Sequence, residues 1–158
     1  MNEIKVINAQ MEHVKECIQI LEQSQIGERH FGDSSKIEEV FINALQKTEL
    51  FVAVSTTGEV VGLLWYMQKG LFGSYPYLHL MVVKENYRNR GIGKQLLSYY
   101  EKNAPLYKRT KCFLLVDDFN PKAKRFYERV GYQAVGKLPN FFKDGVDDYL
   151  MMKVVINE

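Results

Sequence analysis

Residues 88–94, Arg-Asn-Arg-Gly-Ile-Gly-Lys, combine positive charge with glycine in a pattern suited to binding phosphate. A strand is predicted before this segment and a helix after it. The first turn of a helix has N–H groups without partners and the positive end of the helix dipole, which together favour anions. Gly91 and Gly93 lack Cβ, so a ligand can approach the backbone closely. The segment therefore predicts a pyrophosphate-binding loop with the cations Arg88, Arg90 and Lys94.

Two widespread phosphate-binding motifs do not fit this loop. A dinucleotide-binding fingerprint that began at Gly91 would need glycine at position 96, which is Leu96. A Walker A loop needs Ser or Thr after Gly-Lys, whereas Gly93-Lys94 is followed by Gln95. The loop by itself does not identify its ligand.

Two segments together resemble a known family. Residues 88–93, Arg-Asn-Arg-Gly-Ile-Gly, resemble the Arg/Gln-x-x-Gly-x-Gly/Ala loop of the GNAT superfamily of acyl-CoA-dependent N-acetyltransferases. Residues 120–132, Asn-Pro-Lys-Ala-Lys-Arg-Phe-Tyr-Glu-Arg-Val-Gly-Tyr, resemble that family's Asn-x-x-Ala-x-x-Phe-Tyr-x-x-x-Gly-Phe/Tyr segment. Two motifs at this spacing are far more specific than either alone. The resemblance covers nearly the whole chain and is weakest at residues 24–48, where the family varies with its substrate.

The resemblance implies where acetyl-CoA binds. In the family it lies where two parallel strands splay apart, here residues 75–84 and 111–116. The backbone of residues 81–83 is then expected to pair with pantetheine, and the N–H groups of residues 88–94 to hold the pyrophosphate. The implied positions are Met81, Val82, Val83, Arg88, Asn89, Arg90, Gly91, Ile92, Gly93, Lys94, Asn120, Ala123 and Tyr127.

Tyr127 is the candidate catalytic acid. Acyl transfer from a thioester expels a thiolate, and a positioned acid can protonate it. Ordinary thiol and phenol pKa values of roughly 8.5 and 10 are close enough for a hydrogen-bonded tyrosine to act as the donor. Family members place a tyrosine here for that role. Without the motif, Phe126 and Tyr127 would be read as aromatic residues that pack a helix.

The catalytic base has two candidates. The attacking amine is mostly protonated at neutral pH and must lose a proton. His79 lies on the strand before the loop, in phase with Tyr77 and Met81, and titrates in the right range. Some family members use a carboxylate on this strand, but here none precedes Glu85. Either His79 or a water molecule is therefore the base, and His79 can instead line the cleft or be hydrogen-bonded in the core.

Two connections are expected to surround the acceptor. In the family, the connection between the first two helices covers the acceptor site, and here it is residues 27–32. The segment 138–145 is expected to join the last two strands and to form the opposite wall. Two adjacent phenylalanines are hard to hide in a polar loop, so one of them is expected to face the substrate. The candidate substrate-binding residues are Glu28, His30, Phe31, Tyr77, Phe141 and Phe142.

The order of the predicted elements is β-α-α-β-β-β-α-β-α-β-β. Two strand-then-helix units within residues 75–130 require at least one parallel pair, joined by a right-handed crossover. The predicted fold is therefore α/β (α+β): a mixed, mostly antiparallel sheet of about seven strands with helices on both faces. The expected strands are residues 3–8, 50–55, 60–68, 75–84, 111–116, 132–137 and 148–155, and the expected helices are 11–23, 35–47, 94–103 and 121–130.

Length and composition limit the function classes. A chain of 158 residues, 46% hydrophobic and 25% charged, suits one domain over residues 1–158. The longest apolar run, residues 60–67, is far shorter than the roughly 20 residues of a membrane span. No signal peptide is recognised, and Cys17 and Cys112 have no second ligand at metal spacing. We therefore expect a cytoplasmic protein without metal or membrane partner.

The net charge of +2 is unevenly distributed. Residues 84–129 contain twelve Lys and Arg against five Asp and Glu, while the segments on either side are net acidic. This distribution favours a local anion site over a nucleic-acid coat. The phosphates of CoA explain the basic residues more economically, and aromatic residues do not interleave with them as in RNA-binding proteins.

The function predicted from these features is an N-acetyltransferase, an acyltransferase that moves an acetyl group from acetyl-CoA to a primary amine. The amine attacks the thioester directly, and backbone N–H groups near Val82 and Val83 stabilise the oxyanion. The acceptor is a small molecule or amino-acid derivative. The alternative is a protein N-terminus, because residues 146–155 and Phe141-Phe142 loosely resemble ribosomal-protein N-terminal acetyltransferases. A non-catalytic acyl-CoA-binding domain is a further alternative, and either a monomer or a homodimer is expected.

Overall fold

The structure of the protein is a computed structural model that describes residues 3–26 and 36–158. These residues form two compact units. The N-terminal unit holds the described residues up to Tyr66 together with Leu80–Tyr100, and the C-terminal unit holds Met67–His79 and Glu101–Glu158. The organisation as a single domain stays a prediction.

One seven-stranded sheet runs in the order β1-β2-β3-β4-β5-β7-β6. Strands β4 and β5 are parallel, while β1–β2, β2–β3, β5–β7 and β6–β7 are antiparallel, which confirms the predicted mixed sheet. The strands are β1 (Lys5–Asn8), β2 (Leu50–Val54), β3 (Val60–Leu71), β4 (Tyr75–Val83), β5 (Arg109–Asp117), β6 (Gln133–Lys143) and β7 (Val146–Ile156). The helices are α1 (Val14–Glu22), α3 (Ile37–Gln46), α4 (Ile92–Asn103) and α5 (Pro121–Arg129), with 3-10 turns η1 (Met11–His13) and η3 (Glu85–Tyr87).

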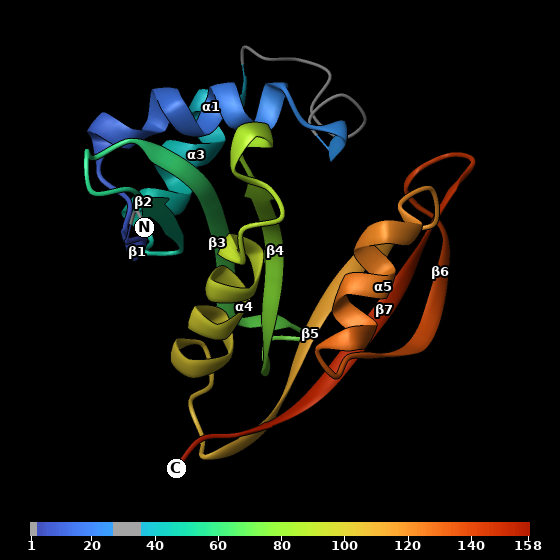
Figure 1. The fold of residues 1–158 in the computed structure, drawn as a ribbon. Coiled ribbons are helices and arrows are strands. Elements are labelled where there is room, and N and C mark those ends of the chain that lie inside the picture. Colours follow the sequence, from blue (N-terminus) through green and yellow to red (C-terminus); the bar gives the residue numbers. More distant parts are fainter. Residues whose placement is uncertain (1–2, 27–35) are drawn as a thin grey trace. The chain divides into compact units, whose positions relative to one another are not determined.

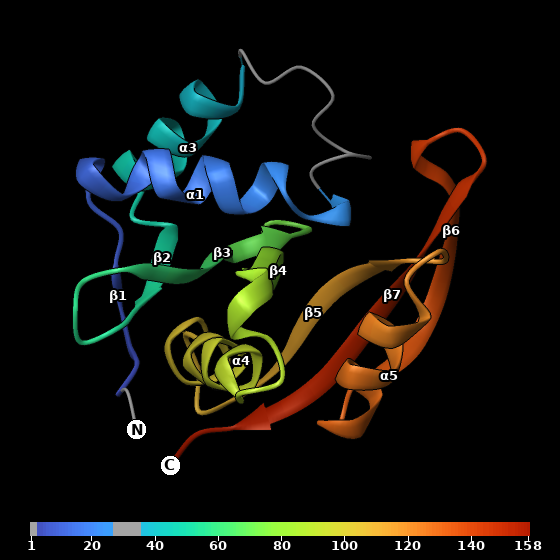
Figure 2. The ribbon, with the colours of Figure 1, turned by 45° about the horizontal axis from the view of Figure 1, so that its top comes forward.

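In the N-terminal unit, helices cover both faces of the sheet. Helices α1 and α3 lie on one side of β2 and β3, and α4 lies on the other (Figure 2). Leu50 and Val52 of β2 join the cluster formed with α1 and α3. Phe51 between them stacks on Tyr66 at 4.7 Å and meets Tyr99 of α4 at 5.2 Å. Because successive side chains of a strand point to opposite faces, β2 is apolar throughout.

In the C-terminal unit, α5 runs beside β7 and β6 (Figure 1). The ring of Tyr127 on α5 meets the edge of Tyr132 at 5.9 Å, just before β6. The ammonium of Lys124 lies 4.5 Å from the ring of Tyr149 on β7. The buried tyrosine and the stem of the lysine therefore attach the helix to the sheet.

The segment 138–145 differs from its predicted form as a loop. Strand β6 continues to Lys143, so Phe141 and Phe142 lie on the strand. Its pairing with β7 shifts register twice, between Ala134 and Gly136 and again between Leu138 and Lys143. Each irregularity interrupts the alternation of apolar and polar residues by which a strand is recognised in a sequence.

The described residues contain no helix long and apolar enough to cross a membrane.

Gly62 on β3 lets α4 pack tightly against the strand. A Cβ at Gly62 would lie 3.1 Å from Leu96 Cδ1 and 3.2 Å from the carbonyl oxygen of Val82. The Gly62→Ala variant is therefore expected to lose about 1–3 kcal/mol of unfolding free energy through overpacking. Urea unfolding measures the loss. Gly136→Ala is the control, because nothing lies within 4 Å of that Cβ position. Equal stability of the two variants would contradict the close packing.

Candidate active site

The segment between β4 and α4 has the backbone of an anion-binding loop. Asn89 and Gly91 are both left-handed, with φ of 62° and 80°. Left-handed residues in such a turn aim successive N–H groups into one concavity. The N–H of Gln95 bonds to the oxygen of Gly91 at 3.1 Å, closing the first turn of α4. The N–H groups of residues 92–94 have no carbonyl four residues earlier within the helix, so they are the ones available to an anion.

The side chains of this loop divide into two groups. Arg88, Asn89, Arg90 and Lys94 are exposed, and the two arginines and the lysine add positive charge around the turn. Ile92 is buried, so its side chain anchors α4 and only its backbone can face a ligand. Nothing lies within 4 Å of a Cβ built on Gly91, which leaves the turn open on that side. The loop therefore fits a pyrophosphate, and Gly93 follows it in the first turn of the helix.

The end of β4 belongs to the N-terminal unit. Val82 is buried in the cluster beneath α1 and α3, while Met81 and Val83 are partly buried. The N–H of Lys84 bonds to the oxygen of Val61 at 2.8 Å, which ties the end of the strand to β3. Pairing of residues 81–83 with pantetheine stays a prediction.

Asn120 caps α5. Its Oδ1 accepts a hydrogen bond from the N–H of Ala123 at 3.1 Å, and Pro121 follows at the first helical position. Such a cap satisfies one of the free N–H groups of the helix and fixes where the helix begins. Asn120 and Ala123 are thus engaged with each other at the start of the helix that carries Tyr127.

Tyr127 lies in an apolar environment. Its side chain is buried, and its ring contacts Phe126 at 5.2 Å and Tyr132 at 5.9 Å between centroids. Burial raises the pKa of Tyr127 above its ordinary value, because the phenolate would lose its hydration. The hydroxyl therefore keeps its proton well into the alkaline range and is a hydrogen-bond donor there.

His79 and Tyr77 lie two residues apart on β4 in the C-terminal unit. Their ring centroids are 6.0 Å apart, so both side chains lie on the same face of the strand. His79 is partly buried, and Tyr77 is buried with Phe113 of β5 opposite it in register. Burial raises the pKa of Tyr77, and the carboxylates of Asp148 and Asp117 raise it further.

These two carboxylates are candidate site residues that the sequence analysis missed. Asp148 on β7 is 1% exposed, and it lies directly opposite Asp117 on β5 in the antiparallel register. Like charges directly opposite one another are unfavourable and attract a cation. The sequence shows Asp117-Asp118 and Asp147-Asp148 as similar acidic pairs. The strand register places Asp148 in a buried position, where its charge raises the pKa of Tyr77.

The predicted substrate-binding residues fall in different places. Glu28, His30 and Phe31 lie outside the described residues. Phe141 and Phe142 are both about half exposed, with ring centroids 4.8 Å apart on β6. Two exposed phenylalanine rings make an apolar surface that a substrate can cover.

The chain matches a protein-family model described as Acetyltransferase (GNAT) family over residues 14–132. Among curated relatives, an N-alpha-acetyltransferase of Sulfurisphaera tokodaii is 30% identical over 122 residues, 70% of this chain and 73% of the relative. A spermine/spermidine N(1)-acetyltransferase of Bacillus subtilis is 32% identical over 90 residues, 51% of this chain and 57% of that one.

Solved structures have the same fold. An acetyltransferase of the GNAT family from Bacillus cereus superimposes with a TM-score of 0.79 at 17% identity, covering 98% of this chain and 99% of its own. Ard1 from Thermoplasma volcanium superimposes with a TM-score of 0.76 at 20% identity, with the same coverage. The family match, the fold and the glycine turn before α4 agree, and the chain belongs to the GNAT family of acetyltransferases.

Proposed function

We propose that the protein transfers an acetyl group from acetyl-CoA to a primary amine. The observation that carries the proposal is the open, left-handed turn at Asn89 and Gly91 in front of α4, with arginine side chains around it. A turn of this form holds a diphosphate through backbone N–H groups. The acetyl thioester supplies the group that is transferred, and the residues of this chain bind and orient it.

The binding residues have separate roles in this proposal. The N–H groups of residues 92–94 bind the pyrophosphate, while Arg88, Arg90 and Lys94 neutralise its charge. Residues 81–83 pair with the pantetheine arm, and N–H groups near Val82 and Val83 stabilise the oxyanion. Asn120 and Ala123 begin the helix that carries Tyr127.

Tyr127 acts on the departing thiolate. Because burial raises the pKa of its hydroxyl, the group is neutral over the working range and donates a hydrogen bond to sulfur as negative charge develops. A donor whose pKa exceeds that of a thiol stabilises the thiolate more by this hydrogen bond than by complete proton transfer. The thiolate then takes up the proton that the attacking amine has lost and leaves as the free thiol of CoA.

The acceptor is proposed to be a cationic primary amine. The buried Asp148 and its neighbour Asp117 attract an ammonium group to the surroundings of Tyr77. His79, on the same face of β4 as Tyr77, is the proposed base, with water as the alternative. A polyamine or other small amine fits these charges, and the relative from Bacillus subtilis is named for such substrates.

A protein N-terminus is the second candidate acceptor. The half-exposed rings of Phe141 and Phe142 on β6 offer an apolar surface to the side chains of a peptide. The Sulfurisphaera tokodaii relative is named an N-alpha-acetyltransferase. A protein N-terminal acetyltransferase would use the same acetyl-CoA site as the small-amine acetyltransferase and would differ only in the acceptor.

Binding and turnover together test the proposal. Saturating acetyl-CoA is expected to raise the Tm, because a ligand that binds the folded state stabilises it by mass action. A panel of polyamines, amino-acid derivatives and short peptides, assayed by release of free CoA thiol, then identifies the acceptor. An unchanged Tm and no calorimetric heat would refute acetyl-CoA binding. Binding without turnover on any amine would favour a non-catalytic acyl-CoA-binding domain.

Gly91 tests the proposed phosphate turn. Gly91→Ala is expected to lower stability by about 1 kcal/mol, the cost of a left-handed residue with Cβ, and to weaken acetyl-CoA binding. Gly91→Val should weaken it further. Gly73→Ala is the matched control, because Gly73 also has positive φ and open space at Cβ but lies in the β3–β4 turn. Equal acetyl-CoA affinity in the Gly91 and Gly73 variants, measured by calorimetry, would remove Gly91 from the site.

Tyr127→Phe is expected to lower kcat on the order of 10²-fold while acetyl-CoA affinity changes little, because the hydroxyl acts mainly in the transition state. Since burial raises the pKa of Tyr127, its ionisation does not contribute to the pH profile below about pH 10, so both enzymes should share the shape of that profile. Tyr132→Phe, which removes a neighbouring buried hydroxyl, is the control. If Tyr127→Phe has wild-type turnover under conditions in which the chemical step is rate-limiting, Tyr127 does not act on the departing thiolate.

A further inference from the structure

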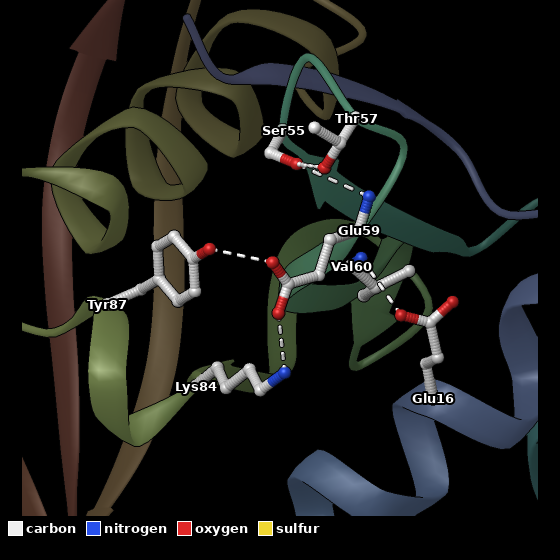
Figure 3. A network of polar contacts seen from close by, with 7 residues as sticks. All are labelled: Glu16, Ser55, Thr57, Glu59, Val60, Lys84 and Tyr87. Carbon is white, nitrogen blue, oxygen red and sulfur yellow. Dashed lines mark hydrogen bonds and ion pairs between the residues drawn. The ribbon is translucent and has the colours of Figure 1, made fainter. Parts of the chain in front are cut away.

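One carboxylate joins the turn before β3 to the segment that leads into the phosphate loop. Glu59 accepts a hydrogen bond from Lys84 Nζ at one oxygen and from the hydroxyl of Tyr87 at the other, each at 2.7 Å (Figure 3). Lys84 directly precedes the turn η3 and Tyr87 ends it. Glu59 therefore holds both ends of η3, the element between β4 and the glycine turn.

The contacts continue from Tyr87 into the loop itself. The N–H of Tyr87 bonds to the oxygen of Lys84 at 2.8 Å, and the N–H of Arg88 bonds to the oxygen of Glu85 at 3.2 Å. Arg88 Nε donates to the oxygen of Val83 at 3.2 Å. The guanidinium of Arg90 lies 5.0 Å from the ring centroid of Tyr87, a cation–π distance. The ring held by Glu59 thus places one of the two arginines proposed to bind pyrophosphate.

Glu59 is itself fixed by its own turn. Its N–H donates to Ser55 Oγ at 3.3 Å, and Ser55 Oγ and Thr57 Oγ1 are 2.9 Å apart. The N–H of the next residue, Val60, donates to Glu16 Oε2 of α1 at 3.0 Å (Figure 3). The carboxylate is therefore presented to Lys84 and Tyr87 from a backbone with little freedom.

The charges at this junction determine which cations remain for a ligand. Hydrogen bonds from Lys84 and then Tyr87 hold the pKa of Glu59 below its ordinary value, so its carboxylate is ionised at neutral pH. The same contact with Glu59 raises the pKa of Lys84. Lys84 is thereby paired within the protein, and the cations left to the loop are Arg88, Arg90 and Lys94.

We propose that Glu59 is a positioning residue for the pyrophosphate loop, holding η3 and the Tyr87 ring so that the loop is in its binding conformation before the ligand arrives. The proposal rests on the proposed function and extends it to a residue outside both family motifs. A loop ordered in advance loses less conformational entropy on binding, so its affinity for the phosphates is higher. Glu59 touches none of the reacting groups and is not expected to affect the chemical step.

The test compares acetyl-CoA with S-acetylpantetheine. The second donor has the same thioester and pantetheine arm but lacks the pyrophosphate together with the adenosine and its 3′-phosphate. Glu59→Gln is expected to raise the KM for acetyl-CoA about five- to tenfold, the effect of weakening one charge-assisted network, with kcat at saturation unchanged. The kcat/KM for S-acetylpantetheine should remain that of the wild type.

Two further variants complete the design. Tyr87→Phe keeps the ring under Arg90 and removes the hydroxyl, so it should raise the KM for acetyl-CoA by less than Glu59→Gln does. The effects of the two substitutions on this KM should not add in the double variant, because both act on the same contact. Glu16→Gln is the matched control, because the hydrogen bond of Glu16 is to the N–H of Val60 and its charge acts on Lys84 less than that of Glu59. Urea unfolding of each variant separates loss of folding from loss of binding.

The outcomes distinguish the two proposals. An unchanged KM for acetyl-CoA in a folded Glu59→Gln variant would refute the positioning role and leave the proposed function intact. Equal losses with both donors would refute it too, because they indicate a general structural effect. A wild-type protein that neither binds nor uses acetyl-CoA would overturn the proposed function and the positioning role with it.

Discussion

The close contact between α4 and β3 at Gly62 is the constraint on which the proposed phosphate loop depends. Leu96 and Ile92 approach the Cβ position of Gly62 to 3.1 and 3.6 Å, so the first turns of the helix are held against the sheet by apolar atoms. This contact sets where the helix starts, and hence where its free N–H groups lie. The left-handed turn at Gly91 follows, because the chain must connect the end of β4 to that fixed start.

Polar contacts fix the other end of the connection between β4 and α4. Burial of Ile92 fixes the helix end of the connection, and the hydrogen bonds of Glu59 fix its strand end through Lys84 and Tyr87. Exposed ion pairs contribute little to stability. The value of these contacts in our proposal is therefore conformational: they select one arrangement of a short loop whose backbone must match a diphosphate.

The basic segment 84–129 divides between several environments in the structure. Lys84 is paired with Glu59, and Arg88, Arg90 and Lys94 surround the glycine turn. An open groove of about 490 Å³ in the C-terminal unit is lined by Lys69 together with Arg109 and Lys111 from the beginning of β5.

The sequence by itself determined the order of the elements, the mixed sheet and the glycine loop before α4. Each depends on residues close together in the chain, where periodicity, glycine and capping chemistry act locally. Tertiary structure decided the features that depend on strand register and on contacts between distant segments. Register buries Asp148 opposite Asp117, shifts in register extend β6 through Phe141 and Phe142, and the turn before β3 brings Glu59 to Tyr87. No local pattern encodes these pairings, because a strand has the same alternation whichever partner residue lies opposite it.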